Sequence, residues 1–190
     1  DKGYLKNIAY PAMRSCAEYW LQRLVKAADG TYECPKEFSP EHGPGRENAT
    51  AHSQQLVWDL FNNTLKAIAE LGISEDATFL DDLNNKFKKL DTGLAIENIN
   101  GKPLLREWKY TSQATVPSYN SHRHMSHLMG LYPGNQIGRD IDANIYEAAL
   151  NSLNTRGYAG TGWSIGWKVN LHARARNGNV CQKLLRTALH

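Results

Sequence analysis

The sequence predicts a mainly α-helical chain whose loops carry the polar residues of a site. Three observations lead to this fold class. Apolar residues recur at helical spacing in several separate segments. Gly or Pro stands where most of these segments end. The connecting loops are long and rich in polar and aromatic residues. Long helices joined by such loops are typical of an α/α toroid, in which loops at one end of the helices build the site.

The first half of the chain contains three predicted helices. The first begins at Pro11, because proline suits the first helical turn, and it runs until Gly30. The second is capped by Thr50 and ended by Gly72, and the third begins at Ser74. The apolar face of the second helix consists of Leu56, Leu60, Phe61, Leu65, Ile68 and Leu71.

The helical period is lost between residues 91 and 120. Within this stretch we predict a short β-hairpin near residues 96–105 that turns at Asn100-Gly101, a dipeptide typical of two-residue hairpin turns. Helical spacing then returns, punctuated by glycines. The three further helices that we predict cover residues 142–154, 163–176 and 179–190.

Residues 121–138 form the most unusual stretch of the chain. His122, His124 and His127 fall within six residues there. We predict a short helix that Pro133 ends, with His124 and His127 on the face that also carries leucines. A helix that is polar at its start and apolar at its end suits the wall of a polar pocket. A cluster of purely structural histidines is the alternative that the spacing leaves open.

The histidine spacing does not predict a metal site. Imidazoles are common metal ligands, but the segment lacks the HExxH pattern, and no carboxylate stands at ligand spacing. We therefore expect no bound metal, and we expect hydrogen bonds between these histidines and other polar groups.

Glu41 lies in a loop that prolines and glycines constrain. A carboxyl held on a rigid loop can act as a general acid if burial raises its pKa. A solvated loop glutamate, without a role in chemistry, fits the same sequence context.

Tryptophans mark two further candidate positions. Glu107 and Trp108 place a carboxyl beside an indole, a combination that sugar pockets often use. Trp163 and Trp167 stand four residues apart and so share a helical face. On spacing alone, core packing is the default interpretation of each of these tryptophans.

Charge and hydropathy exclude two classes of partner. The net charge is +3, with Lys and Arg scattered along the chain. Nucleic-acid binding requires a basic stripe, which the sequence lacks. The mean hydropathy is −0.56, and no apolar run reaches membrane-spanning length. We therefore expect no nucleic-acid and no membrane partner.

Five motifs occur along the chain in order. They are residues 39–41 (SPE), 54–61 (QQLVWDLF), 106–108 (REW), 122–134 (HRHMSHLMGLYPG) and 162–168 (GWSIGWK). Together they resemble the catalytic domain of glycoside hydrolase family ninety-five, which comprises inverting 1,2-α-L-fucosidases and their α-L-galactosidase relatives. The resemblance covers nearly the whole chain, and the order of the motifs makes it specific.

The resemblance implies that residues 1–190 are a single partial catalytic domain, part of an (α/α)6 barrel (a toroid of six helical hairpins). It implies that Glu41 is the general acid and that no metal or organic cofactor is needed. One histidine of the 122–127 segment would bind substrate. The candidate substrate-binding residues are His124, His122, Glu107, Trp108 and Trp163.

Two motifs of the family are missing. Its water-activating asparagine pair lies upstream of the Ser-Pro-Glu loop, and its partner aspartate lies downstream of the Gly-Trp-Ser helix. Asn98 and Asn100 have the right spacing, but they follow Glu41 and lie in the predicted hairpin. Ser53 also replaces the aspartate with which the family's second helix commonly starts. Because inversion needs an acid and an activated water on opposite faces of the sugar, we expect a fragment that is inactive alone.

The parent enzyme implied by this resemblance is a secreted or periplasmic α-L-fucosidase that removes terminal 1,2-linked fucose from fucosylated oligosaccharides. Its expected partners are the glycan substrate and the rest of its own catalytic domain. Two alternatives remain open: an α-L-galactosidase of the same family, and a non-catalytic helical module that binds carbohydrate or serves a structural role.

Overall fold

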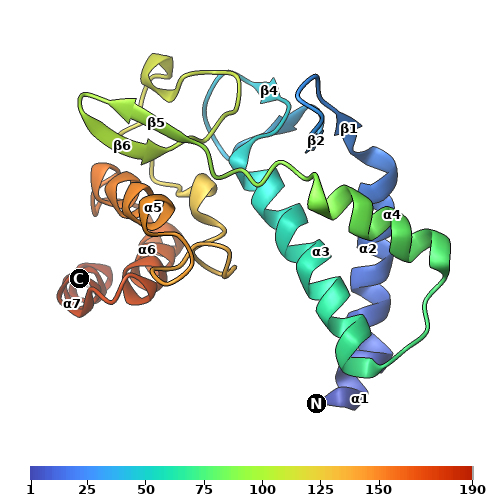
Figure 1. Ribbon diagram of the computed structural model, residues 1–190. Coiled ribbons are helices and arrows are strands. Elements are labelled where there is room, and N and C mark those ends of the chain that lie inside the picture. Colours follow the sequence, from blue (N-terminus) through green and yellow to red (C-terminus); the bar gives the residue numbers. More distant parts are fainter. Residues whose placement is uncertain (190) are drawn as a thin grey trace.

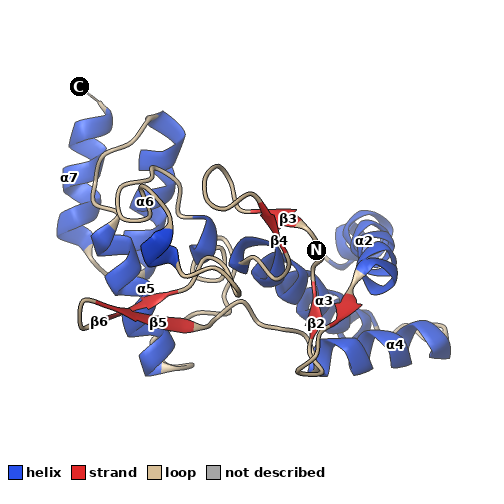
Figure 2. Cartoon of the chain, turned by 90° about the horizontal axis from the view of Figure 1, so that it is seen from above, coloured by secondary structure: helices blue, strands red, loops and turns tan. Residues whose placement is uncertain are grey.

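The computed structural model describes residues 1–189. Two groups of helices lie on either side of the loops that carry the predicted site (Figure 1). Three small antiparallel strand pairs lie between or beside the helices (Figure 2). The mainly helical class is therefore confirmed, whereas the closed (α/α)6 barrel stays a prediction.

The N-terminal group contains the helices α1 to α4. Their bounds are Lys2–Tyr4 for α1, Tyr10–Arg23 for α2, Ala51–Leu71 for α3 and Ala77–Lys88 for α4. A π-helical turn over Leu5–Ala9 joins α1 to α2. Pro11 follows this turn, and because proline has no N–H donor it needs no carbonyl from the turn.

Three helix boundaries differ from the sequence prediction. The first helix begins before Pro11, at Lys2, and α2 ends at Arg23 rather than near Gly30. It ends early because residues 25–26 form strand β1, which pairs with the next segment of the chain. The third helix is capped by Asp76 instead of Ser74, and the Asp76 carboxylate accepts a hydrogen bond from the backbone of Phe79.

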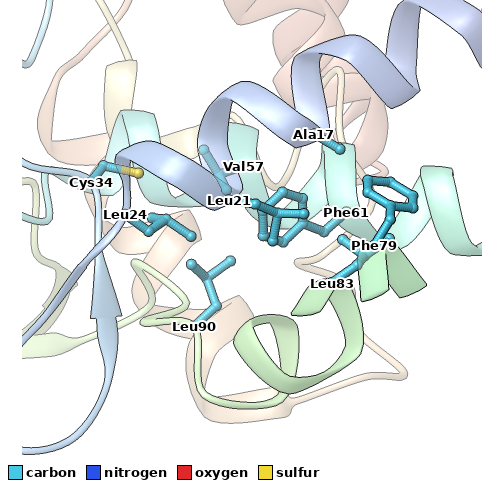
Figure 3. Packing of buried hydrophobic residues seen from close by; sticks show 9 residues of the cluster. All are labelled: Ala17, Leu21, Leu24, Cys34, Val57, Phe61, Phe79, Leu83 and Leu90. Atoms are coloured by element: carbon cyan, nitrogen blue, oxygen red, sulfur yellow. The ribbon is translucent and has the colours of Figure 1, made fainter. Parts of the chain in front are cut away.

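The N-terminal group has its own apolar core between α2, α3 and α4 (Figure 3). Phe61 of α3 and Leu83 of α4 are completely buried there. The buried members of this core are Ala17, Leu21, Leu24, Cys34, Val57, Phe61, Phe79, Leu83 and Leu90. Since α3 contributes two of them, this core fixes the helix whose N-terminus lies beneath the predicted site.

The strand pairs are short. Their bounds are Val25–Lys26 (β1) with Tyr32–Glu33 (β2), Glu37–Phe38 (β3) with Arg46–Glu47 (β4), and Ile96–Ile99 (β5) with Lys102–Leu105 (β6). The last pair confirms the predicted hairpin, and both turn residues, Asn100 and Gly101, have positive φ as the tight turn requires. The β3–β4 pair closes the base of the loop that carries Glu41.

The C-terminal group contains α5 (Ala143–Thr155), α6 (Gly162–Arg174) and α7 (Gly178–Ala188). All three confirm the predicted helices, although the predicted last position, His190, lies outside the described residues. The hairpin joins this group, because the backbone N–H of Leu105 donates to the Ser152 hydroxyl over 2.9 Å. The buried members of the second core are Leu105, Met125, Leu128, Leu131, Ile137, Ala148, Ala149, Leu153 and Leu171.

The histidine segment is not the helix that its spacing predicts. Only Ser126–Leu128 forms a short 3₁₀ turn, and the rest consists of turns and bends. The Gln55 side chain of α3 explains the difference, since its amide donates to the carbonyl of His127 over 2.8 Å and accepts from the N–H of Gly130 over 2.7 Å. Backbone groups that would bond within a helix are therefore bonded to α3.

None of the helices in residues 1–189 is long and apolar enough to cross a membrane.

Candidate active site

A cleft of about 800 Å³ lies between the two groups of helices. It is bounded by the loop after β3, the histidine segment and the start of α6. The residues that line it are Pro40, Glu41, His52, Arg123, His124, Ser126, Met129, Tyr132, Pro133, Thr161, Trp163 and Trp167. The structure thus brings together residues from motifs that are more than a hundred positions apart in the sequence.

Glu41 enters this cleft from the β3–β4 loop. Its carboxylate pairs with the Arg123 guanidinium, and the side chains are 56% and 42% exposed. Ion pairs this exposed contribute at most about 1 kcal/mol, since water solvates both partners. The Glu41 carboxyl can therefore leave Arg123 and turn toward a ligand at little cost.

Aromatic rings form a wall of the same cleft. The Trp163 indole is stacked on that of Trp167, with ring centroids 5.3 Å apart and an interplanar angle of 17°. Trp167 is fixed from behind, because its Nε1–H donates to the Tyr132 carbonyl over 2.9 Å. Trp163 remains 60% exposed. The pair presents a flat apolar surface of the kind that packs against the C–H face of a sugar ring.

His124 lies beside this wall, with its ring centroid 4.9 Å from that of Trp163. The side chain lines the cleft although the residue is only 5% exposed. Burial and the neighbouring Arg123 charge lower the pKa of His124, so the imidazole is neutral at pH 7. Its Nε2 makes no hydrogen bond to any described residue. This nitrogen is itself buried, so the structure does not present it to the cleft.

Glu107 lies behind the cleft wall and is completely buried. Its carboxylate accepts hydrogen bonds from the Ser39 hydroxyl over 2.5 Å and from His42 Nε2 over 3.2 Å, and it pairs with Arg156 Nη2 at 2.5 Å. Burial opposes ionisation, but the His42 bond and the adjacent charge of Arg156 outweigh it and hold the pKa of Glu107 well below its usual range. Glu107 is therefore an ionised group in the interior.

His122 and His127 also lie behind the wall. Burial is the main cause that lowers the pKa of His122 to about 4 and that of His127 to about 3. The His122 ring is stacked on His42 with centroids 4.0 Å apart. His127 Nδ1 lies 3.4 Å from Glu107 Oε2. Both imidazoles are consequently neutral at pH 7.

Of the predicted site residues, Glu41, His124 and Trp163 meet in the cleft. His122 does not line it, and Glu107 and Trp108 are completely buried. The structure therefore corrects the expected placement of Glu107 and Trp108, because a side chain with no exposed surface cannot touch a substrate. The indole of Trp108 instead packs edge-on against His42, with ring centroids 5.1 Å apart.

Sequence reasoning missed three residues of this region. Ser39 and His42 flank Glu41 in its own loop, so their proximity in the sequence was a usable signal. Arg156 follows the last residue of α5, and nothing in its sequence neighbourhood points to Glu107. Within residues 1–189, no three or more His, Cys, Asp and Glu side chains are grouped so as to hold a metal ion.

A carboxyl, a neutral imidazole and stacked indoles facing one cleft at the ends of helices are typical of a helical enzyme that acts on carbohydrates. The model of the glycosyl hydrolase family 95 catalytic domain matches residues 1–190. The chain belongs to this family.

Curated relatives carry related names. The chain is 33% identical over 180 residues to the probable alpha-fucosidase A of Aspergillus niger, which covers 88% of this chain. It is 30% identical over 193 residues to alpha-L-fucosidase 2 of Arabidopsis thaliana, covering 97% of this chain. A probable alpha-fucosidase A of Aspergillus oryzae is 33% identical over 159 residues, or 80% of this chain. The matches span 22%, 22% and 21% of the respective relatives, about a fifth of their length.

Proposed function

We propose that this chain is the acid-bearing part of a glycoside hydrolase catalytic domain and that the whole enzyme is an α-L-fucosidase. The observation that carries the proposal is the position of Glu41, which lies in one cleft with His124 and the stacked indoles. The Ser-Pro-Glu motif that contains Glu41 resembles the acid motif of the family. The names of the relatives support fucose as the sugar released.

In this proposal Glu41 donates a proton to the glycosidic oxygen as the bond to the anomeric carbon breaks. Its loop is held at the base by β3 and β4, so the carboxyl is presented from a defined position. His124 lines the cleft beside Trp163, and its imidazole is the proposed hydrogen-bond partner for a sugar hydroxyl. Trp163 covers an apolar face of the ring.

We further propose that the enzyme inverts the anomeric centre of terminal 1,2-linked fucose. An inverting enzyme needs a second group that activates water on the face opposite the acid. In this proposal that group comes from the rest of the catalytic domain, of which residues 1–190 form one part within an (α/α)6 barrel. The enzyme would act outside the cytoplasm, secreted or periplasmic, where fucosylated oligosaccharides reach it.

Fucose is preferred to galactose in this proposal because of the side chains that line the cleft. The two sugars differ in a methyl or a hydroxymethyl group. Met129, Pro133 and Trp167 line the cleft with apolar surface, which favours the methyl group. The corresponding measurement is kcat/KM for matched fucosides and galactosides, and a preference for the galactoside would argue for the α-L-galactosidase alternative.

Glu41→Gln in the full-length enzyme tests the acid role. Turnover of an unactivated fucosyl glycan should fall by about 10²–10⁴-fold, the usual contribution of general-acid catalysis. Turnover of an aryl fucoside with a good leaving group should fall far less, since that leaving group departs without a proton. Glu70→Gln is the matched control, because Glu70 is also an exposed glutamate in a surface ion pair, with Lys2. Near-normal turnover of the glycan by Glu41→Gln would exclude this role.

A further inference from the structure

The loop that carries Glu41 is attached to the buried Glu107 carboxylate on both sides of the acid. Ser39, two residues before Glu41, donates its hydroxyl to Oε1 over 2.5 Å. His42, the residue after Glu41, donates from Nε2 to Oε2 over 3.2 Å. Because Ser39 is completely buried and the His42 side chain is only 8% exposed, water does not compete for these bonds.

The histidine segment is attached to the same carboxylate through Arg156. One nitrogen of the guanidinium, Nη2, binds Glu107 Oε2 at 2.5 Å, and the other, Nη1, donates to the carbonyl of His124 over 2.6 Å. The two guanidinium nitrogens have a fixed spacing, so this fork sets the distance between Glu107 and the His124 backbone. In addition, the Ser126 hydroxyl donates to the carbonyl of Pro40, which joins the two segments directly.

Like the exposed Glu41–Arg123 pair, this buried ion pair joins the loop that carries Glu41 to the histidine segment, and in this it differs from ion pairs that only connect helices. The Arg14–Glu75 pair, for example, joins helix α2 to the segment just before α4. The Arg156–Glu107 pair instead binds the loop that carries Glu41 and the segment that carries His124. Burial of a charge pair is costly and is offset only when the remaining bonding positions of both partners are filled. Here they are filled by the two segments that face the cleft.

We propose that Glu107 and Arg156 are positioning residues of the active site, which set Glu41 and His124 relative to each other without touching the substrate. This inference rests on the proposed role of Glu41 as general acid. It gives the Arg-Glu-Trp motif a function that its complete burial permits, in place of the contact with sugar that the sequence suggested.

Ser39→Ala in the full-length enzyme is the test variant, because it releases the acid loop from Glu107 and leaves the Arg156–Glu107 pair intact. Displacement of a catalytic group by about 1 Å can cost on the order of 10²-fold in rate. We expect kcat on an unactivated 1,2-linked fucosyl glycan to fall by about 10–100-fold while KM changes by less than about threefold. On an aryl fucoside with a good leaving group, kcat should fall by less than about threefold, since proton donation matters little there.

Ser112→Ala is the matched control. The Ser112 hydroxyl also donates to a glutamate carboxylate, that of Glu97, and neither residue lines the cleft. This variant should keep the kinetics of the wild type on both substrates. Thermal unfolding of both variants, measured alongside, shows how much folded enzyme each assay contains.

Two results would overturn the inference. One is that Ser39→Ala has the kinetics of Ser112→Ala, and the other is that its rates on both substrates fall by the same factor, as a purely structural role requires. A separate arm tests the proposed function: if Glu41→Gln hydrolyses the glycan at a normal rate, the acid assignment fails and the positioning role fails with it. If Glu41→Gln is inactive and Ser39→Ala is normal, only the positioning role fails.

Discussion

Gly43 lies so close to the Trp108 indole that a Cβ atom at Gly43 would fall 2.3 Å from Trp108 Cζ2. Gly43 also has a φ of +111°, which side chains rarely permit. Trp108 is completely buried and cannot move aside. This contact therefore fixes the course of the chain two residues after Glu41.

Gly43→Ala should destabilise the full-length enzyme by about 2–4 kcal/mol, the sum of the backbone cost and the clash. Turnover should fall as well, because the loop that carries Glu41 must shift. Gly45→Ala is the matched control: its φ is +100°, but no atom lies within 4 Å of the added Cβ. Gly45→Ala should lower the free energy of unfolding by about 1–2 kcal/mol and leave turnover unchanged. Urea unfolding and turnover of both variants check the prediction, and equal losses would contradict it.

From the stacked indoles we predict that loss of Trp163 weakens substrate binding but has little effect on stability. Trp163→Ala should raise KM for a fucosyl substrate about tenfold, since a contact worth about 1–1.5 kcal/mol is lost, with little change in Tm because Trp163 is 60% exposed. Tyr19→Ala is the control, since Tyr19 is a 56% exposed ring that packs against Trp20. Its KM should equal that of the wild type. An unchanged KM in Trp163→Ala would remove Trp163 from the binding site.

Because His127 is buried, we predict that the free energy of unfolding of the enzyme depends on pH. Burial, reinforced by Arg156 and His42 and opposed by Glu107, lowers the pKa of His127 from 6.5 to about 3. Below pH 6.5 the unfolded chain therefore binds a proton that the folded chain does not, so the free energy of unfolding falls as the pH falls, by about 1.4 kcal/mol per pH unit for this one group. Above pH 6.5 the contribution of His127 is constant.

The measurement is the free energy of unfolding of the full-length enzyme between pH 6.5 and pH 4.5. In His127→Gln the free energy of unfolding should depend less steeply on pH, by the amount that corresponds to about one proton. The range ends near the ordinary pKa of a glutamate, 4.5, because the depressed pKa of Glu107 adds its own loss of stability below that pH. An identical slope in the wild type and in His127→Gln would show that His127 takes up its proton in the folded state.

Local signals were sufficient for much of the fold. The second predicted helix has the bounds that Thr50 and Gly72 indicate, with Gly72 in the left-handed conformation at its end. The hairpin turns where Asn100 and Gly101 predict it. In each case the residues that decide the structure lie next to the element that they delimit.

The histidine segment could not be predicted in this way. Its helical spacing is real, but the groups that determine its backbone belong to Gln55, which is 72 positions away from His127. The same limit applies to the site. Glu41 and Trp163 were recognisable from motifs, whereas the burial of Glu107 depends on Arg156, a partner 49 positions away. Contacts between residues so far apart in the sequence produce no periodic pattern from which they could be predicted.

The last prediction is that residues 1–190 alone catalyse no glycoside hydrolysis. Among the described residues that line the cleft, Glu41 is the only carboxyl. Asn98 lies in β5 and Asn100 in the adjoining turn, and neither lines the cleft. A proton donor without a group that activates water on the opposite face of the sugar cannot complete inversion.

Expression of residues 1–190, followed by an assay for fucose released from a 1,2-linked fucosyl glycan, tests this prediction, with the full-length enzyme as the positive control. The chain should also self-associate in light scattering, because Phe38, Leu56 and Trp163 are 40%, 41% and 60% exposed, and exposed apolar surface favours association. Circular dichroism confirms that the expressed chain is helical before the assay is read. Multiple turnovers by this chain, lost in Glu41→Gln, would show that it holds a water-activating group as well as the acid.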